Sequence, residues 1–201
     1  NFNDSSWTDV SFRSAPSQNI VAQQLYPIRN VETIPAQYMN KLNDSLYVFD
    51  LGRNIAGVTK LKIKGKAGAM VRLIHTERLS PNGRVDLGRI SNFHRPTDEE
   101  DLFQTDTYVL SGKGEDVFMP KFNYKGFRYV EVSCSEPMEL KKECLTGYFM
   151  HNDVPEVGNV ATSDPIINKI WKATNVSYLS NLFGYPTDCP QREKNAEKRS
   201  I

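Results

Sequence analysis

Short runs of alternating apolar and polar residues, separated by glycine-rich turns, fill residues 45–150 and constrain the fold most strongly. Val58, Leu61 and Ile63 are interleaved with lysines, so one face of that strand should be buried and the other solvated. Turns are expected at residues 65–68 and 81–83, where glycine recurs. Strands are expected at residues 45–51, 58–64, 70–75, 106–110, 117–119, 127–132 and 145–150. The pattern predicts a mostly β fold, an antiparallel, jelly-roll-like β-sandwich.

The pattern changes to helical periodicity at residue 163. Ser163 or Asp164 can cap a helix, and Pro165 suits its first turn. Apolar residues then recur at spacings of three and four as far as about Phe183, before Gly184. One amphipathic helix cannot bury its stripe alone, so the stripe should pack on the sandwich, on a second copy or on another domain. Self-association is predicted through the four central stripe residues, Ile167, Ile170, Trp171 and Tyr178.

Charge and hydropathy exclude several classes of partner. Lys plus Arg number 25 and Asp plus Glu 24, so the formal net charge of +1 gives no drive toward nucleic acid or anionic membranes. No apolar run approaches the roughly 20 residues of a membrane span, and the first ten residues are polar and lack the apolar stretch expected of a signal peptide. The three cysteines offer no metal-binding pair; free thiols are favoured over a Cys134–Cys144 disulfide. A neutral ligand or a protein partner is therefore expected.

The densest cluster of chemically active side chains lies just beyond the predicted helix, at residues 184–193. Asp188 and Glu193 flank Gln191 and Arg192 there, between two prolines. A carboxylate and a guanidinium can hold vicinal sugar hydroxyls, and a second carboxyl can protonate a glycosidic oxygen. Judged by composition alone, the segment could instead be a polar loop that only ends the helix and binds no sugar.

The segment PTDCPQRE at residues 186–193 resembles the signature that opens the catalytic domain of bacterial α-L-rhamnosidases, glycoside hydrolase family 78. Further segments resemble the same family in the same order: YVFDLGRN at 47–54, QTDTY at 104–108, FNYKGFRYV at 122–130 and SDP at 163–165. Together they span residues 46–193, about three quarters of the chain.

The resemblance implies inverting hydrolysis that releases terminal α-L-rhamnose from glycosides or polysaccharides, without a cofactor or metal. Glu193 matches the general acid, and Asp188 and Arg192 match residues that line the sugar pocket. The catalytic base lies much further along in the family. The family's Gly-Trp-Thr-Gly-Asp stretch after the acid is replaced here by residues 194–201, KNAEKRSI. We therefore expect this chain to be an inactive fragment.

These patterns and the resemblance divide the chain into four predicted regions. Residues 1–44 are expected to be the tail of a preceding accessory domain and a lead-in strand, with a further extended piece at 20–25. Residues 45–150 form the sandwich, 151–162 a linker, and 163–201 the truncated start of an (α/α)6 catalytic barrel. A non-catalytic carbohydrate-binding or structural sandwich is the alternative function. The family suggests a periplasmic or secreted location.

The remaining candidates are interpreted as structural. His75, His94 and His151 lack metal-ligand spacing, and a long solvated loop that includes the acidic run at 98–101 is expected over residues 88–103. The aromatic residues at 118–129 are expected in the core rather than on a sugar-stacking surface.

Overall fold

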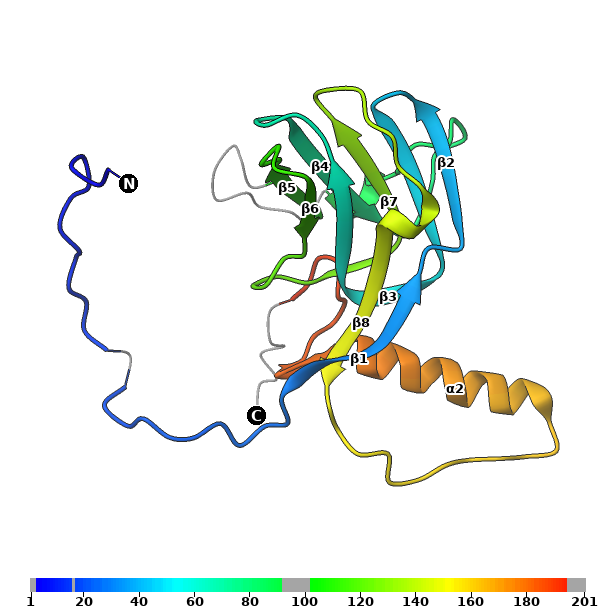
Figure 1. Cartoon of the computed structure of the whole chain (residues 1–201). Coiled ribbons are helices and arrows are strands. Elements are labelled where there is room, and N and C mark those ends of the chain that lie inside the picture. Colours follow the sequence, from blue (N-terminus) through cyan, green and yellow to red (C-terminus); the bar gives the residue numbers. More distant parts are fainter. Residues whose placement is uncertain (1–2, 16, 92–101, 195–201) are drawn as a thin grey trace.

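The computed structural model describes residues 3–15, 17–91 and 102–194, and one curled antiparallel sheet dominates it (Figure 1). The strand order is β1-β8-β3-β7-β4-β5, and β2 and β6 also pair with β3. The strands are β1 (Ile28–Pro35), β2 (Tyr38–Asn43), β3 (Leu46–Lys64), β4 (Met70–Thr76), β5 (Thr105–Val109), β6 (Glu115–Phe118), β7 (Lys125–Cys134) and β8 (Leu145–Asn152). The prediction of a mostly β, antiparallel fold is confirmed.

Strand β3 is the centre of the sheet, since it pairs with four other strands. Its first part pairs with β2 and β7, and its second part pairs with β8 and β6. The register with β7 shifts between Asp50 and Ile55, which is the irregularity expected of a bulge that bends a strand. The sequence predicted two separate strands here. The segment instead continues as one strand of 19 residues, because β7 pairs with it on both sides of the bulge.

The core lies on the concave side of the curled sheet and consists of inward-facing aromatic and aliphatic side chains. Its largest fully buried members include Tyr47, Phe49, Leu61, Phe127 and Leu145. The Tyr47 hydroxyl donates a hydrogen bond of 2.9 Å to the carbonyl of Met138, so its one polar atom is paired. The alternation predicted for the second half of β3 is present, with its leucine and isoleucine buried and its last two lysines exposed.

The sheet extends beyond residues 45–150 on both sides. Strands β1 and β2 precede that range, and β8 continues to Asn152. Residues 20–25, expected to be extended, form no strand, since no neighbouring strand pairs with them; Ile20 is 97% exposed. The segment before β1 runs away from the sheet in Figure 1, and its large side chains, such as Phe12, are exposed.

Helix α2 (Pro165–Ser180) begins where its capping chemistry predicts. The Asp164 side chain accepts a hydrogen bond of 2.7 Å from the Ile166 amide, and Pro165 occupies the first turn. The helix ends three residues before the predicted Phe183. The chain instead turns into a short hairpin of β9 (Leu182–Phe183) and β10 (Tyr185–Pro186), with Gly184 at φ 83° between the strands.

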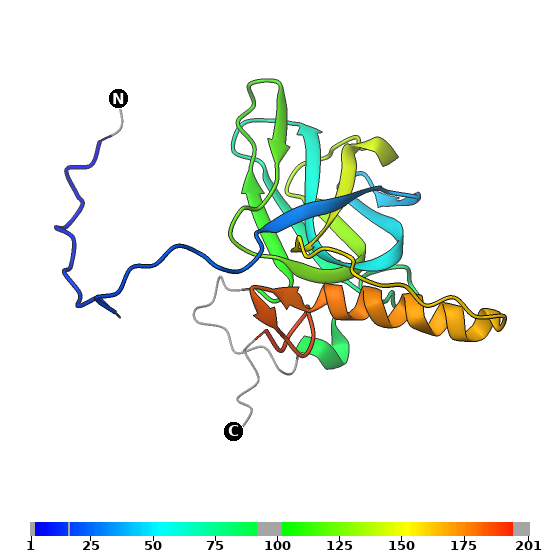
Figure 2. The same cartoon turned by 90° about the horizontal axis from the view of Figure 1, so that it is seen from below.

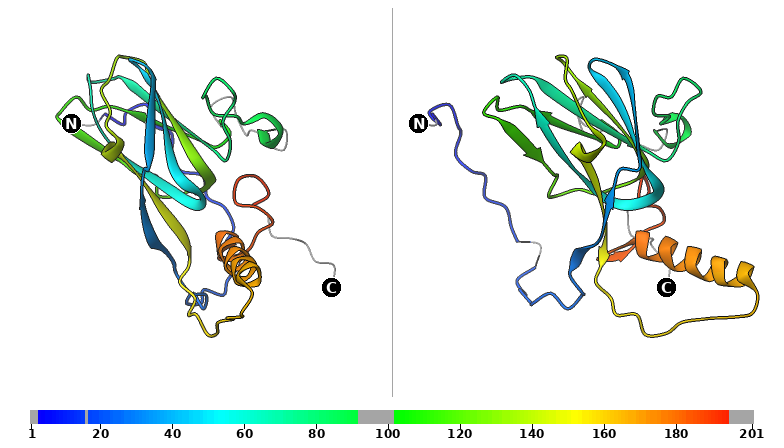
Figure 3. Two further views of the ribbon diagram at one scale, coloured as in Figure 1. Left: turned by 90° about the vertical axis from the view of Figure 1, so that its right-hand side faces the viewer. Right: turned by 45° about the vertical axis from the view of Figure 1, so that its right-hand side comes forward.

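Only the C-terminal end of α2 meets the sheet, next to β8, while the rest of the helix projects beyond it (Figures 1 and 2). Three members of the predicted stripe, Ile167, Ile170 and Tyr178, are 48%, 59% and 56% exposed, and Trp171 is half-buried. Figure 3 shows the same projecting helix from two further directions. In the described residues the stripe therefore does not fold back onto the sheet. No described helix has the length and apolar character to cross a bilayer.

The other structural expectations have mixed outcomes. All three cysteines are free thiols. His75 and His151 are buried in strands, whereas His94 and the acidic run at 98–101 lie outside the described residues. The expected loop after residue 88 begins with a short helix, α1 (Gly88–Ser91). Phe127 belongs to the core as predicted, but Phe122 is 99% exposed because it lies in the loop before β7.

Candidate active site

The loop at residues 187–194, which follows β10, carries the three side chains that the sequence singled out; we call it the signature loop. The Thr187 amide donates to the Asn181 carbonyl over 2.9 Å, which holds the start of the loop against the end of α2. Further along, the loop packs on the first residues of β7. A Cβ added to Gly126 would lie 2.9 Å from Cγ of Pro190, so this close approach requires glycine.

An aromatic stack holds the hairpin before the signature loop against the sheet. The rings of Tyr124 and Phe183 lie with their centroids 3.6 Å apart and only 4° from parallel. The Gly184 amide also donates to the side-chain oxygen of Asn152 at the end of β8. The sheet therefore fixes the loop from two sides.

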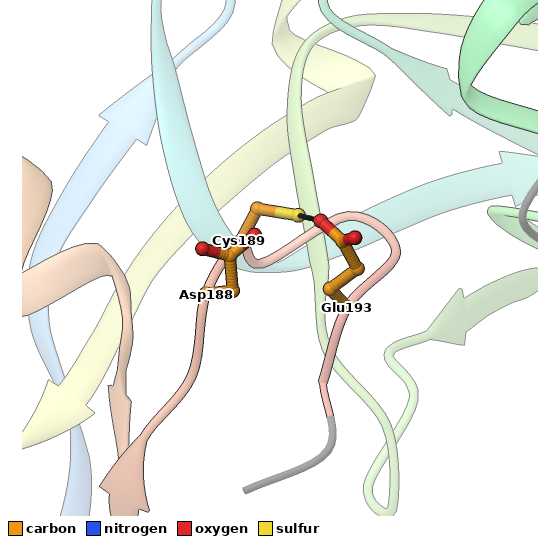
Figure 4. Close-up of side chains that lie close together, drawn as sticks. All are labelled: Asp188, Cys189 and Glu193. Carbon is orange, nitrogen blue, oxygen red and sulfur yellow. Dashed lines mark hydrogen bonds between the residues drawn. The ribbon is translucent and has the colours of Figure 1, made fainter. Parts of the chain in front are cut away.

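The loop brings Asp188, Cys189 and Glu193 together (Figure 4), and Arg192 contacts Glu193. The Cys189 thiol donates a hydrogen bond of 3.1 Å to Oε2 of Glu193, and Nε of Arg192 lies 3.3 Å from the same oxygen. One ligand atom each from Asp188, Cys189 and Glu193 lies within 4.8 Å of the others. Asp188 is exposed, and the other three residues are half-buried.

These neighbours lower the pKa of Glu193. The thiol of Cys189 contributes most, followed by a hydrogen bond with Asp188 and then by the charge and hydrogen bond of Arg192, while partial burial acts in the opposite direction. In this structure Glu193 is therefore ionised near neutral pH, with 43% of its side chain exposed. A catalytic proton donor needs the opposite shift, which burial in an apolar pocket would supply.

Asp188, Cys189 and Glu193 offer the ligand atoms of a metal site. The protonated thiol of Cys189 instead favours a hydrogen-bonded network. Burial raises the pKa of the Cys189 thiol. A metal would require the thiolate, whereas this thiol is positioned to donate its proton to Glu193.

A cavity of about 240 Å³ lies beside the signature loop, between it and the segments that lead into β5 and β7. Its lining combines three cations with polar side chains and two large apolar residues. The lining residues are Leu102, Phe103, Gln104, Thr105, Asn123, Tyr124, Lys125, Gln191, Arg192 and Lys194.

A buried ion pair forms the base of this region. Nζ of Lys125 lies 2.6 Å from Oδ1 of Asp106, and these side chains are 6% and 5% exposed. Burial lowers the pKa of Lys125, while the carboxylate of Asp106 acts to raise it. The two side chains come from β5 and β7, which lie on either side of β4 in the sheet.

His75 of β4 packs beneath the same pair as a neutral ring. Burial, followed by the nearby charge of Lys125, lowers the pKa of His75 to about 3. Nδ1 lies 3.1 Å from the carbonyl of Gln104, which can only accept, so Nδ1 carries the proton. Nε2 then accepts from the hydroxyl of Thr59 at 3.0 Å. His75 is thus a satisfied core residue, in agreement with the structural interpretation made from its spacing.

Sequence reasoning missed Asp106, Lys125 and Lys194 as members of this region. The available signal was the alternation of side chains along a strand, which places residues two apart on the same face. Lys125 shares the inward face of β7 with Phe127, where a charged residue is unexpected unless it is paired.

Comparison with known proteins places both parts of the chain in one family. Residues 40–151 match the family profile described as the bacterial alpha-L-rhamnosidase concanavalin-like domain. Residues 155–196 match the bacterial alpha-L-rhamnosidase 6 hairpin glycosidase domain.

Among curated relatives, alpha-L-rhamnosidases of Streptomyces avermitilis and Formosa agariphila are each 33% identical, over 195 and 197 residues. These alignments cover 96% of this chain but only 18% and 20% of the relatives, so the chain spans about a fifth of their length.

Solved structures of similar proteins have the same fold. The alpha-L-rhamnosidase of Dictyoglumus thermophilum superposes with a TM-score of 0.78 at 32% identity, covering 96% of this chain and 21% of that one. The Streptomyces avermitilis alpha-L-rhamnosidase complexed with L-rhamnose gives 0.73 at 35% identity, covering 86% and 16%.

Proposed function

This chain belongs to the bacterial α-L-rhamnosidase family, and we propose on that basis that it is part of a glycoside hydrolase that releases terminal α-L-rhamnose by inverting hydrolysis. Glu193 is the proposed general acid, and Asp188 and Arg192 are the proposed sugar ligands. The observation that carries the proposal is the convergence of these three side chains in one loop that the sheet holds in place. The solved relative complexed with L-rhamnose supports a rhamnose-containing substrate.

Asp188 is too close to Glu193 to be the second catalytic carboxylate of an inverting pair. Inverting hydrolases keep their two carboxyl groups about 6.5–9.5 Å apart, which leaves room for the attacking water. A ligand oxygen of Asp188 lies within 4.8 Å of one of Glu193. In this proposal Asp188 therefore binds sugar hydroxyls together with the Arg192 guanidinium, and the base comes from another part of the whole protein.

The environment of Glu193 supports a proposal of inactivity for the 201-residue chain. Its lowered pKa and partial exposure favour the carboxylate, and a carboxylate cannot protonate a leaving oxygen. The remaining walls of the pocket would have to exclude water and weaken the contacts of Glu193 with Cys189 and Arg192.

Hydrolysis of p-nitrophenyl α-L-rhamnoside tests both parts of the proposal. We expect no turnover by the 201-residue chain. In the whole protein, Glu193→Gln should lower kcat by about 10²–10⁴-fold, the usual contribution of a general acid. Glu139→Gln, at an exposed site, is the matched control. Turnover by the isolated chain, or full activity of Glu193→Gln, would overturn the assignment.

We also propose that the exposed stripe of α2 packs against the other helical hairpins of the glycosidase domain in the whole protein and drives self-association of this chain alone. The match of residues 155–196 to the six-hairpin domain and the exposure of Ile167 and Ile170 support this. Light scattering should give a mass above that of one chain, falling to 22.9 kDa in the double variant Ile167→Lys, Ile170→Lys. Ala173→Lys, exposed but outside the stripe, should leave the association intact. A monomeric parent chain would refute the self-association.

A further inference from the structure

Three cations and no carboxylate are among the residues that line the cavity beside the signature loop. Lys125 is paired with Asp106 at 2.6 Å, and Arg192 contacts Glu193 at 3.3 Å. The third cation, Lys194, contacts neutral groups: its ammonium donates to the Tyr124 carbonyl and lies 4.3 Å from the centroid of the Tyr124 ring.

The charged groups around Lys194 come from three elements. Lys125 at the start of β7 repels its charge, while Asp106 of β5 and Cys189 of the signature loop favour it. Arg192 and Glu193 of the loop form an ion pair. Asp188 lies within 4.8 Å of Glu193, and the charge of Arg192 also acts on Glu77, which follows β4. Burial and then the charge of Lys125 lower the pKa of Lys194 to about 8. The ammonium groups of Lys125 and Lys194 thus repel each other at the edge of the cavity. The buried carboxylate of Asp106 already pairs with Lys125.

We propose that this cavity binds the carboxylate of an acidic sugar, with Lys194 as its ion partner. An anion there would lie beside an ammonium that already contacts only a carbonyl and an aromatic ring among its described hydrogen-bond and ring partners. Gln104, Asn123 and Gln191 line the same cavity and offer amide donors and acceptors for sugar hydroxyls.

The size of the cavity suits one sugar unit. Its volume of about 240 Å³ is below the roughly 300–1,000 Å³ of sites for drug-sized ligands. Arg192 lines the cavity and also contacts Glu193, so a sugar bound here would be a neighbour of the proposed general acid. If that sugar is the unit attached to rhamnose, the substrates are rhamnosides of uronic acids; this extension rests on the proposed function.

Calorimetric titration of the 201-residue chain with D-glucuronate, D-glucose and acetate tests the proposal without any turnover. We expect glucuronate to bind at least tenfold more tightly than either of the other two. Equal affinity for glucose would refute the role of the charge, and equal affinity for acetate would refute recognition of the sugar. No saturable binding of glucuronate would refute the site, while the rhamnosidase proposal would still be decided by its own assay.

The pH dependence of glucuronate binding and two variants test whether Lys194 is the ion partner. Between pH 7 and pH 9 the protonated fraction of a group with a pKa of about 8 falls roughly tenfold, so glucuronate affinity should fall by about that factor. Lys194→Gln should weaken binding at least tenfold at pH 7, and Lys194→Arg should restore binding and remove the pH dependence. Lys121→Gln, exposed in the loop before β7, should change neither. A Lys194→Gln variant that binds glucuronate normally would overturn the assignment.

Discussion

The buried ion pair of Lys125 and Asp106 offers the most informative perturbation of the sheet. Replacing Lys125 by Met keeps an unbranched side chain but leaves the Asp106 carboxylate, whose side chain is 5% exposed, with the Asn123 amide at 3.3 Å. Removing one partner of a buried pair costs about 3–5 kcal/mol. Protonating an aspartate at pH 7 costs about 4 kcal/mol, which limits the penalty because the isolated carboxyl can take up a proton instead. We therefore expect Lys125→Met to lower the free energy of unfolding by about 3–4 kcal/mol at pH 7.

The destabilisation should depend on pH and on the partner. As the pH falls from 7 toward 5, protonation of the lone carboxyl becomes less costly, so the defect should shrink by up to about 1.4 kcal/mol per unit. The double variant Lys125→Met, Asp106→Leu removes both charges and should be less destabilised than Lys125→Met alone. The difference between the double variant and the sum of the single variants should reach at least about 2 kcal/mol.

Urea unfolding followed by circular dichroism at pH 7 and pH 5 measures these free energies. Lys62→Met, at an exposed position of β3, is the control and should change stability by less than about 0.5 kcal/mol. A loss below about 1 kcal/mol for Lys125→Met, or additive effects in the double variant, would mean that the pair is neither desolvated nor coupled.

Three smaller predictions concern single contacts. Tyr47→Phe leaves a buried backbone carbonyl without its donor and should lower the free energy of unfolding by about 1–2 kcal/mol in urea titrations. Asp164→Ala removes the N-cap of α2 and should cost about 1 kcal/mol, seen as a loss of helical circular dichroism on heating before the sheet melts. Gly126→Ala forces a Cβ to within 2.9 Å of Pro190 and should cost about 1–3 kcal/mol, with the largest amide chemical-shift changes in the signature loop; changes confined to β7 would contradict this.

Local chemistry made some elements predictable from sequence. The start of α2 follows from Asp164 and Pro165, since a cap acts only on the amides that immediately follow it. The grouping of Asp188, Arg192 and Glu193 follows from their separation of at most five residues in a proline-stiffened loop. The end of α2 was less predictable, because Leu182 and Phe183 suit a helix but form one strand of a short hairpin, and Phe183 stacks on the distant Tyr124.

Pairing between distant segments was the part that the sequence did not reveal. The cavity exists because residues 102–105 and 123–125 lie against residues 191–194, and no periodicity reports which strands are neighbours. The ion pair of Asp106 and Lys125 joins β5 to β7 across β4, so it requires the strand order as well as the strands. Strand β3 was predicted as two pieces because the polar stretch around Asn54 is typical of a turn, whereas β7 pairs with both sides of it.

The contacts of the signature loop give the sheet a role in positioning the candidate acid. Phe183 before the loop stacks on Tyr124, Pro190 within it packs against Gly126, and Lys194 at its end donates to the Tyr124 carbonyl. All three contacts reach residues 124–126, at the start of β7, and β7 is held by β3 and β4 on either side. Because residues before, within and at the end of the loop all contact residues 124–126, a displacement of β7 would move Glu193 with it. The β domain therefore acts on Glu193 as a positioning support, even though no side chain of the sheet forms a hydrogen bond to that carboxylate among the contacts of the described residues.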